Sequence, residues 1–291
     1  MYPELLRLGP FVISSYGFML VVAFITAYVM INRDGKRLGW PPELAQDIVF
    51  WAAIGGILGS KIYYLIENIG RGSGDNLAGL WNIIAGIFTL SPQRIAEGIQ
   101  NFGAGLVFLG GLMGGMLAIT LLLRKKKINW LATADVLAPY LILGYAIGRI
   151  GCFLVGDDYG IPTHLPWGIA FENGLPPTTY HMFQIRYPWI DLTGFEPGVL
   201  TVHPTQLYEV IVGGSIFAFL YRFRLRARFV GQVFALYLML AGIERFLIEF
   251  IRTNHHYLFG LTGAQVFALI MISVGGFLSY WLPRRTRTDT S

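Results

Sequence analysis

The sequence has few charged residues and a single cysteine. Charged residues make up 13% of its 291 residues, about half of the roughly 25% typical of soluble domains. One cysteine excludes a disulfide bond within the chain. No basic segment precedes the first apolar run, and basic residues follow it, so no cleavable signal peptide is expected. The sequence also lacks metal-ligand spacings and nucleotide-binding loops, so no metal or other cofactor is expected.

Hydrophobic residues are abundant instead, at 54% of the chain. They gather in seven runs, most of them close to the roughly 20 residues that a helix needs to cross a bilayer. The runs are Ser14–Asn32, Gln46–Ile66, Gly103–Leu123, Leu131–Val155, Thr205–Phe223, Phe229–Ile251 and Leu261–Leu282. We therefore predict an all-α integral membrane protein with about seven transmembrane helices.

Basic residues follow the odd-numbered runs. Clusters of three, four, four and three follow the first, third, fifth and seventh runs, which accounts for fourteen of the 22 basic residues. Because basic residues mark the cytoplasmic side of a membrane, the N-terminus is expected outside and the C-terminus in the cytoplasm. The net charge of +5 is then explained by topology, and no nucleic-acid partner is expected.

Two polar stretches interrupt what we predict to be a single membrane domain, 1–291. The outside elaboration at 70–102 contains an apolar segment, Asn76–Leu90, too short to span. It is expected to form a helix in the outer interface or, equally well, a helix packed on the bundle. The stretch 156–203 is rich in proline and predicts a small outside head with short strands such as Trp167–Phe171. Glycines four residues apart, such as Gly55 with Gly59 and Gly110 with Gly114, predict close helix packing.

Two arginines fall within the predicted outer half of the membrane. Arg149 lies late in the fourth run and Arg245 late in the sixth. An ionised side chain at this depth indicates a functional site. Arg245, Glu249 and Arg252 have the spacing of one helix face. Two arginines at similar depth repel each other unless an anion lies between them, and a lipid phosphate suits the planar guanidinium.

Structural ion pairs are the alternative explanation for these arginines. Arg149 would then pair with Asp157 or Glu249, and Arg245 with Glu244 or Glu249. Asp157 and Asp158 follow the fourth run, where they can orient the guanidinium or a substrate.

Three further positions could belong to a site. His203, Gln206 and Glu209 are spaced to face one side at the mouth of the fifth helix, although His203 could equally be a structural cap. Cys152 follows Arg149 by one turn and is either a nucleophile or, more often, a small packing residue. Tyr16 fits an interfacial aromatic position.

Four motifs together resemble the prolipoprotein diacylglyceryl transferases. They are GRIGCFLVGDDYG, VHPTQLYE, ERFLIEFIR and SYGFM, in the family's order and spacing across nearly the whole chain. The resemblance implies transfer of a diacylglyceryl group from phosphatidylglycerol to the lipobox cysteine thiol of a prolipoprotein, in the inner (cytoplasmic) membrane of a bacterium. A thioether forms and glycerol phosphate leaves. A monomeric enzyme is expected, and the alternative is a non-enzymatic lipid-binding or lipid-transport protein.

The resemblance also assigns roles to residues. The catalytic residues it implies are Arg149, Arg245, Glu249 and His203. The residues it implies for substrate binding are Arg149 and Arg245 again, with Tyr16, Asp157, Gly160, Gln206 and Arg252. Three positions depart from the family pattern: Leu109 replaces a frequent histidine, Cys152 an asparagine and Ala241 a tyrosine. Since leucine cannot accept a proton, the group that activates the thiol stays open among Glu249, Asp157, His203 and water.

Overall fold

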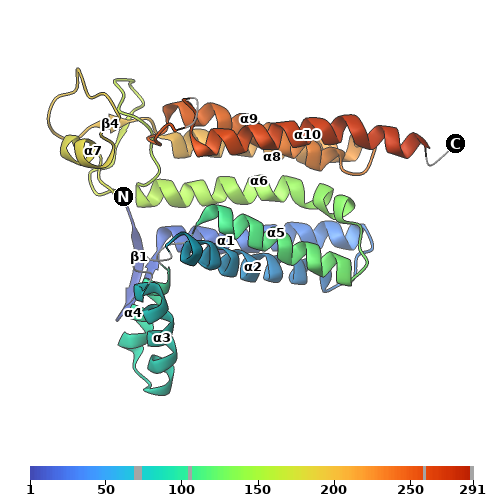
Figure 1. The fold of residues 1–291 in the computed structure, drawn as a ribbon, viewed down its shortest axis with the longest axis horizontal. Coiled ribbons are helices and arrows are strands. Elements are labelled where there is room, and N and C mark those ends of the chain that lie inside the picture. The colour runs from blue at the N-terminus through green and yellow to red at the C-terminus, as the bar shows by residue number, and fades with distance from the viewer. Residues whose placement is uncertain (69–73, 104–106, 258–259, 289–291) are drawn as a thin grey trace. The chain divides into compact units, whose positions relative to one another are not determined.

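The computed structural model describes residues 1–68, 74–103, 107–257 and 260–288, which are mostly helical (Figure 1). The chain forms two compact units. The first contains Met1–Leu5, Ile13–Ile31 and the chain from Leu131 onwards, and the second contains Leu6–Val12 and Asn32–Trp130. That the two units act as one membrane domain stays a prediction.

A helix lies at each of the seven predicted apolar runs. These helices are α1 (Ser15–Arg37), α2 (Leu44–Glu67), α5 (Phe108–Lys125), α6 (Trp130–Val155), α8 (Thr205–Phe223), α9 (Gln232–Ile248) and α10 (Gly263–Thr288). Among the described residues, α1, α2, α6 and most of α10 are long and apolar enough to cross a membrane. The chain is therefore a multi-pass membrane protein, and crossing by α5, α8 and α9 stays a prediction. Residues 104–106, inside the third predicted run, lie outside the described residues.

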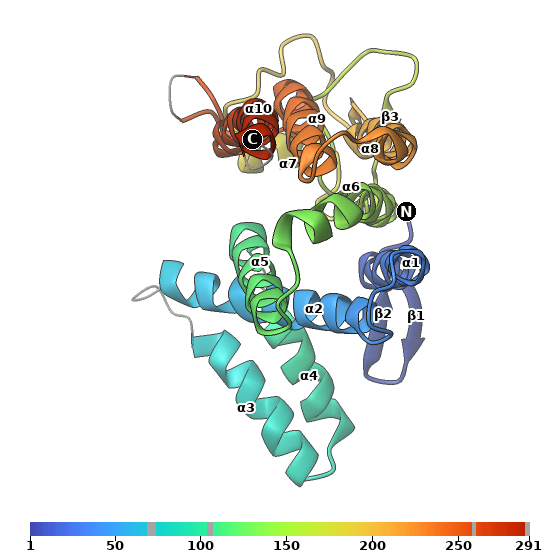
Figure 2. The same cartoon turned by 90° about the vertical axis from the view of Figure 1, so that its right-hand side faces the viewer.

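The first unit has its core between three helices. Ala138 and Ile142 of α6 pack with Leu220 of α8 and with Val233 and Ala241 of α9, all almost fully buried. The helices α6, α8, α9 and α10 run side by side (Figures 1 and 2). The small side chains of Ala138 and Ala241 let the helix backbones approach each other at this core.

The predicted head at 156–203 contains a short helix, α7 (Tyr180–Arg186), and a small two-stranded sheet. The strands β3 (Ile169–Ala170) and β4 (Thr201–Val202) pair antiparallel, so the expected strand at Trp167–Phe171 is confirmed only at its centre. Tyr159, Phe171 and Phe183 form an aromatic core beneath this sheet. The head is therefore an ordered platform next to the end of α6.

A second pair of strands adds to a chain predicted to be all-α. The strands β1 (Glu4–Leu8) and β2 (Phe11–Ser14) form a two-stranded sheet before α1. Two turn residues, Gly9 and Pro10, separate the strands, and Gly9 adopts a positive φ of 59°, as tight turns require.

The second unit confirms the predicted glycine packing. The helices α2 and α5 meet through Gly55 and Gly59 on one side and Gly110 and Gly114 on the other. A Cβ added to Gly55 would stand 2.6 Å from the carbonyl oxygen of Gly114. This backbone contact excludes any larger side chain.

The apolar segment predicted at Asn76–Leu90 forms a helix, α3 (Gly74–Phe88), but it has a partner that the sequence did not predict. That partner is α4 (Pro92–Gly103), which lies beside it (Figure 2). A Cβ on Gly98 would lie 2.7 Å from the carbonyl oxygen of Gly79. Trp81 and Phe88 stay exposed on the outer side of α3. Residues 69–73, at the start of this predicted elaboration, lie outside the described residues.

Candidate functional site

The site in the first unit begins with Arg149, late in α6. Tyr145 precedes it by one turn, and the guanidinium carbon lies 5.1 Å from the centre of the Tyr145 ring. A Cβ added to Gly151 would stand 3.2 Å from Cα of Tyr16, so α1 crosses α6 beside the arginine. The side chain of Arg149 is 14% exposed. Arg149 is therefore held within packed helices but keeps an accessible edge.

The turn after α6 directs an acid back toward this arginine. Gly156 has a φ of +76° and Asp158 a φ of +57°, and the amides of Gly156 and Asp157 both donate to the carbonyl of Cys152. Left-handed residues reverse the chain at a helix end in this way. The Asp158 carboxylate then lies 2.6 Å from Nη1 of Arg149.

Glu209 of α8 is the centre of the cluster and is fully buried. Its Oε2 lies 3.3 Å from Nε of Arg149, and its Oε1 lies 3.4 Å from Nη1 of Arg245 and of Arg252. The Tyr145 hydroxyl donates to Oε1 at 2.7 Å. One carboxylate thus lies among three guanidinium groups. The chain itself therefore supplies part of the negative charge expected between the arginines.

The expected common face of Arg245, Glu249 and Arg252 is wrong for Arg252. Arg245 and Glu249 do pair, with Nη2 to Oε2 at 3.0 Å. However, α9 ends at Ile248, Glu249 begins a 3-10 turn, and Arg252 is extended with a φ of −89° and a ψ of 163°. The Arg252 side chain still reaches the cluster, where Nη2 lies 2.8 Å from Oδ1 of Asp158.

Gly160 explains how Arg252 arrives there. The two residues form an isolated antiparallel bridge, which ties the head to the end of α9. A Cβ on Gly160 would collide with the carbonyl oxygen of Ile251 and would stand 2.8 Å from Cβ of His203. Only glycine leaves room for this backbone contact. Gly160 is therefore a residue that positions Arg252.

The residues at the mouth of α8 divide between two neighbourhoods. Gln206 is fully buried, and its Nε2 donates to the Asp157 carbonyl at 2.5 Å, so Gln206 and Glu209 do share a face as predicted. His203 instead places Nδ1 3.4 Å from the hydroxyl of Tyr208. Among the described residues, His203 takes part in none of the ion pairs of the cluster.

The pKa values of the two acids after α6 are shifted in opposite directions. Burial and the adjacent Asp158 raise the pKa of Asp157 to about 6. Burial alone would also raise the pKa of Asp158, but Arg252 and Arg149 outweigh it and lower this pKa to about 2. Burial lowers the pKa of His203. At neutral pH, Asp158 is therefore a carboxylate and His203 is mostly uncharged.

The arginines differ in how much of each can reach a ligand. The Arg149 and Arg245 side chains are 14% and 23% exposed, whereas Arg252 is 6% exposed. Since a guanidinium has five N–H donors, Arg149 and Arg245 can bind Glu209 and still offer donors to an added anion. Arg252 is better suited to hold Asp158 in place.

Cys152, Asp157 and Asp158 have the spacing of a possible metal site, with ligand atoms within 4.8 Å of one another. Both oxygens of Asp158 already pair with arginines, which a cation would have to displace. Nη1 of Arg149 also lies 3.8 Å from the sulfur of Cys152. This chemistry favours an anion over a metal ion in the cluster.

Sequence reasoning missed the central role of Glu209 and the contribution of Tyr145. It also favoured Asp157 over Asp158 as the partner of Arg149. The signal for Glu209 was an acid inside an apolar run, three residues after Gln206 on the same helix face. Glu244 accepts a hydrogen bond from Tyr145 at 3.3 Å, and the ion pairs of the described residues do not include it.

Nearly the whole chain matches one known family. The model described as prolipoprotein diacylglyceryl transferase aligns with residues 3–281. The chain belongs to this family.

Several similar proteins carry the name phosphatidylglycerol–prolipoprotein diacylglyceryl transferase. The one from Clostridium tetani is 29% identical over 96% of each chain. The one from Coxiella burnetii is 32% identical over 97% of this chain and 95% of its own. A third, from Nitratidesulfovibrio vulgaris, is 31% identical over 98% of this chain and 94% of its own. Membership in the family makes the chain a transferase.

The three departures from the family pattern lie in different surroundings. Cys152 is buried in the first unit, one turn after Arg149. Ala241 is buried in the core between α6, α8 and α9. Leu109 belongs to α5 of the second unit and is 37% exposed. None of the three changes the acids and arginines that form the cluster.

Proposed function

We propose that this chain transfers the diacylglyceryl group of phosphatidylglycerol to the lipobox cysteine thiol of prolipoproteins. Membership in the transferase family supports this activity. The observation that carries the proposal is the pair Arg149 and Arg245, both held on buried Glu209 and both still partly exposed. The proposed role of the pair is to bind the phosphate of the lipid.

The chemistry requires stabilisation of a leaving phosphate. The thiol sulfur forms a bond to the glyceryl carbon, the bond from that carbon to the phosphate oxygen breaks, and glycerol phosphate leaves. The thiol proton passes to solvent or to the departing phosphate. Cations fixed in advance within a dry site stabilise the charge that grows on this oxygen. Glu209 and Asp158 fix Arg149 before the substrate arrives, so little reorganisation is needed.

The other site residues have supporting roles in this scheme. Glu249 holds the Arg245 guanidinium, and Asn254 donates to Glu249 at 2.5 Å. Gln206 fixes the backbone at Asp157, and Gly160 admits Arg252. Tyr16, which lies against Gly151, would border the lipid at the outer end of α1.

The proposed topology places the cluster in the outer leaflet. Seven helices would cross the inner membrane of a bacterium, with the N-terminus and head outside and the C-terminus in the cytoplasm. The clustering of basic residues after alternate helices supports this orientation. The exposed aromatic side of α3 supports its place in the outer interface. A single copy of the chain would contain the complete arginine cluster.

The direct test uses the purified chain with phosphatidylglycerol and a lipobox peptide. Release of glycerol phosphate, with a matching gain in peptide mass, is the expected result. A peptide with serine in place of the lipobox cysteine is the control and should gain no mass. Tight binding of phosphatidylglycerol without turnover would instead support a lipid-binding or lipid-transport protein.

We also propose that no single side chain is the essential base for the thiol. Glu249 already forms an ion pair with Arg245, with Nη2 to Oε2 at 3.0 Å, so its carboxylate is engaged before a thiol arrives. His203 lies beside Tyr208 and takes no part in the ion pairs of the cluster among the described residues. The positive field of Arg149 and Arg245 would then favour the thiolate.

A pH–rate profile tests the role of the base. His203→Ala should keep the rate within about tenfold of the unsubstituted chain, because a positioned base contributes about 100-fold or more. A loss of several orders of magnitude with phosphatidylglycerol binding retained would make His203 the base. Leu109→His is expected to raise the rate at low pH and to change it little at high pH.

A further inference from the structure

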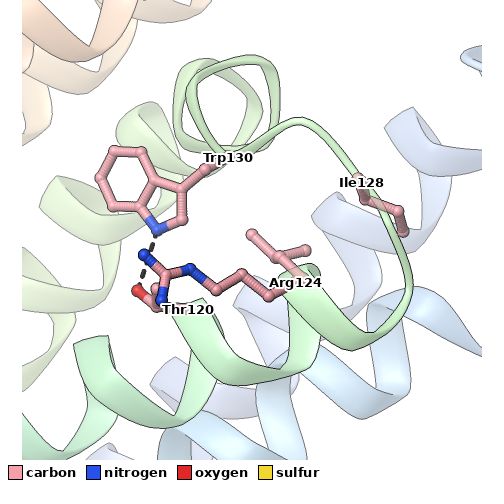
Figure 3. Close-up of a pocket in the computed structure, with 5 residues that line it drawn as sticks. Thr120, Arg124, Ile128 and Trp130 are labelled. Carbon is pink, nitrogen blue, oxygen red and sulfur yellow. Dashed lines mark hydrogen bonds between the residues drawn. The ribbon is translucent and has the colours of Figure 1, made fainter.

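A pocket of about 270 Å³ lies in the second unit, at the turn between α5 and α6 (Figure 3). Its walls are Thr120, Leu123 and Arg124 of α5, Ile128 of the turn and Trp130 at the start of α6. Ligand pockets for whole small molecules typically measure about 300 to 1,000 Å³. This pocket is smaller, which suits a single polar group such as a phosphate with its glycerol.

Arg124 is available to bind a ligand there. The last carbonyls of α5 are already satisfied by the chain that follows, because Lys126, Lys127 and Ile128 donate their amides to them. Arg124 is thus not needed as a helix cap. Among the described residues its guanidinium has no acidic partner, whereas neighbouring Lys126 pairs with Asp47 at 2.6 Å.

Trp130 and Thr120 shape the wall opposite the end of the helix. The indole Nε1 of Trp130 donates to Oγ1 of Thr120 at 3.1 Å, and that hydroxyl donates to the Met116 carbonyl. Figure 3 shows Arg124 extended back along α5 toward these two residues. A tryptophan and an arginine at the end of an apolar membrane helix typically lie at the depth of the lipid head groups.

An apolar stripe leads away from the pocket along α5. Met113, Leu117 and Leu121 follow one another at intervals of four, and Arg124 comes three residues later. All three apolar side chains are exposed by half or more. Residues at this spacing share one helix face. The face therefore combines a cationic end with an apolar track, which matches the two parts of one phospholipid.

The charge around the pocket selects among lipids. Arg124 to Lys127 are four consecutive basic residues, and Lys126 is paired with Asp47. Basic pockets between membrane helices on the cytoplasmic side bind anionic head groups. A zwitterionic lipid adds a cation that the Arg124 guanidinium, inside the pocket, would repel.

We propose that this pocket binds an anionic phospholipid, with its phosphate on Arg124 and an acyl chain along the stripe from Leu121 to Met113. The site uses none of the residues of the arginine cluster and does not depend on the transfer reaction. A lipid bound here holds the turn between α5 and α6 at the level of the head groups.

Native mass spectrometry of the full chain in detergent measures this binding. The probes are phosphatidic acid, phosphatidylcholine with the same acyl chains, and inorganic phosphate. Arg124→Gln should weaken retention of phosphatidic acid about tenfold, the loss expected for a charge-assisted pair. Lys125→Gln, which removes the adjacent charge from outside the pocket, is the matched control and should bind like the unsubstituted chain.

The Arg149→Ala background separates this site from the proposed substrate site. In that background, phosphatidic acid should still bind. Adding Arg124→Gln to Arg149→Ala should still weaken this binding. Equal losses for Arg124→Gln and Lys125→Gln would overturn the proposal, and so would equal retention of phosphatidylcholine. Inorganic phosphate binding as tightly as the lipid would also overturn it. If Arg124→Gln does not fold, Arg124→Lys replaces it and should bind with intermediate strength, because its charge lacks the planar fork.

Discussion

Glu209 shows why single residues decide this site. Its buried carboxylate contacts Arg149, Arg245 and Arg252. Three guanidinium groups this close repel one another without an anion between them. A buried ion pair adds little net stability when complete, but removing one partner strongly destabilises the fold because the remaining charges stay buried.

We therefore expect Glu209→Gln to lose both activity and stability. The free energy of unfolding should fall by about 3 to 5 kcal/mol, and the transfer rate by about 100-fold or more. Glu244→Gln is the matched control, because within the described part of the chain Glu244 accepts a single hydrogen bond, from Tyr145, worth about 1 kcal/mol. Denaturation in detergent and glycerol phosphate release measure the two effects. Equal effects of the two substitutions would contradict the central role of the Glu209 carboxylate.

Asp158 predicts a dependence of stability on pH. Its pKa is about 2 in the folded chain, against an ordinary value of 3.8. Because the folded state favours the carboxylate, the contribution of Asp158 is complete above about pH 4 and is lost as the pH falls toward 2. Asp158→Asn should cost roughly 1 kcal/mol at pH 7, a figure reduced because the side chain is 46% exposed.

Thermal unfolding of both chains between pH 7 and pH 2 tests this dependence. The difference between the unsubstituted chain and Asp158→Asn should shrink below pH 4. A difference that stays constant down to pH 2 would mean that Asp158 does not act through its charge.

At the scale of the elements, the apolar runs predicted the helices well, but not the contacts at their ends. A run of about 20 apolar residues has few structural alternatives in a membrane, so all seven predicted runs contain helices. The turn of Glu249 and the extended Arg252 could not be read from spacing, because a bridge to distant Gly160 sets them. The helix α4 has too polar a sequence to resemble a span, and it pairs with α3 through glycines.

The bridge between Gly160 and Arg252 gives a test at this scale. Gly160→Ala should reduce transfer about tenfold or more, because the new methyl group displaces the Ile251 carbonyl and with it Arg252. Gly144→Ala on α6 is the control, since a Cβ there meets no described atom within 4 Å. Its rate should be unchanged. A normal rate for Gly160→Ala, measured by glycerol phosphate release, would show that transfer does not require the bridge.

At the scale of the whole molecule, the sequence predicted the chemistry of the site better than it predicted which side chains of the site contact one another. The motifs around Arg149, His203 and Arg245 indicated the family, and the family model covers residues 3–281. The two arginines expected at similar depth do meet on one carboxylate. That this carboxylate is Glu209 depends on the packing of α6, α8 and α9, which periodicity within each helix does not determine.

The central claim is that Arg149 binds the lipid phosphate during transfer. The most direct measurement is glycerol phosphate release by Arg149→Ala, with folding checked by thermal unfolding and with exposed Arg222→Ala as a control for the loss of a basic residue. Arg149→Ala should lose transfer by about 100-fold or more while remaining folded, Arg149→Lys should also be poor because it lacks the planar fork, and Arg222→Ala should be normal. Turnover at the unsubstituted rate in a folded Arg149→Ala chain would contradict the account.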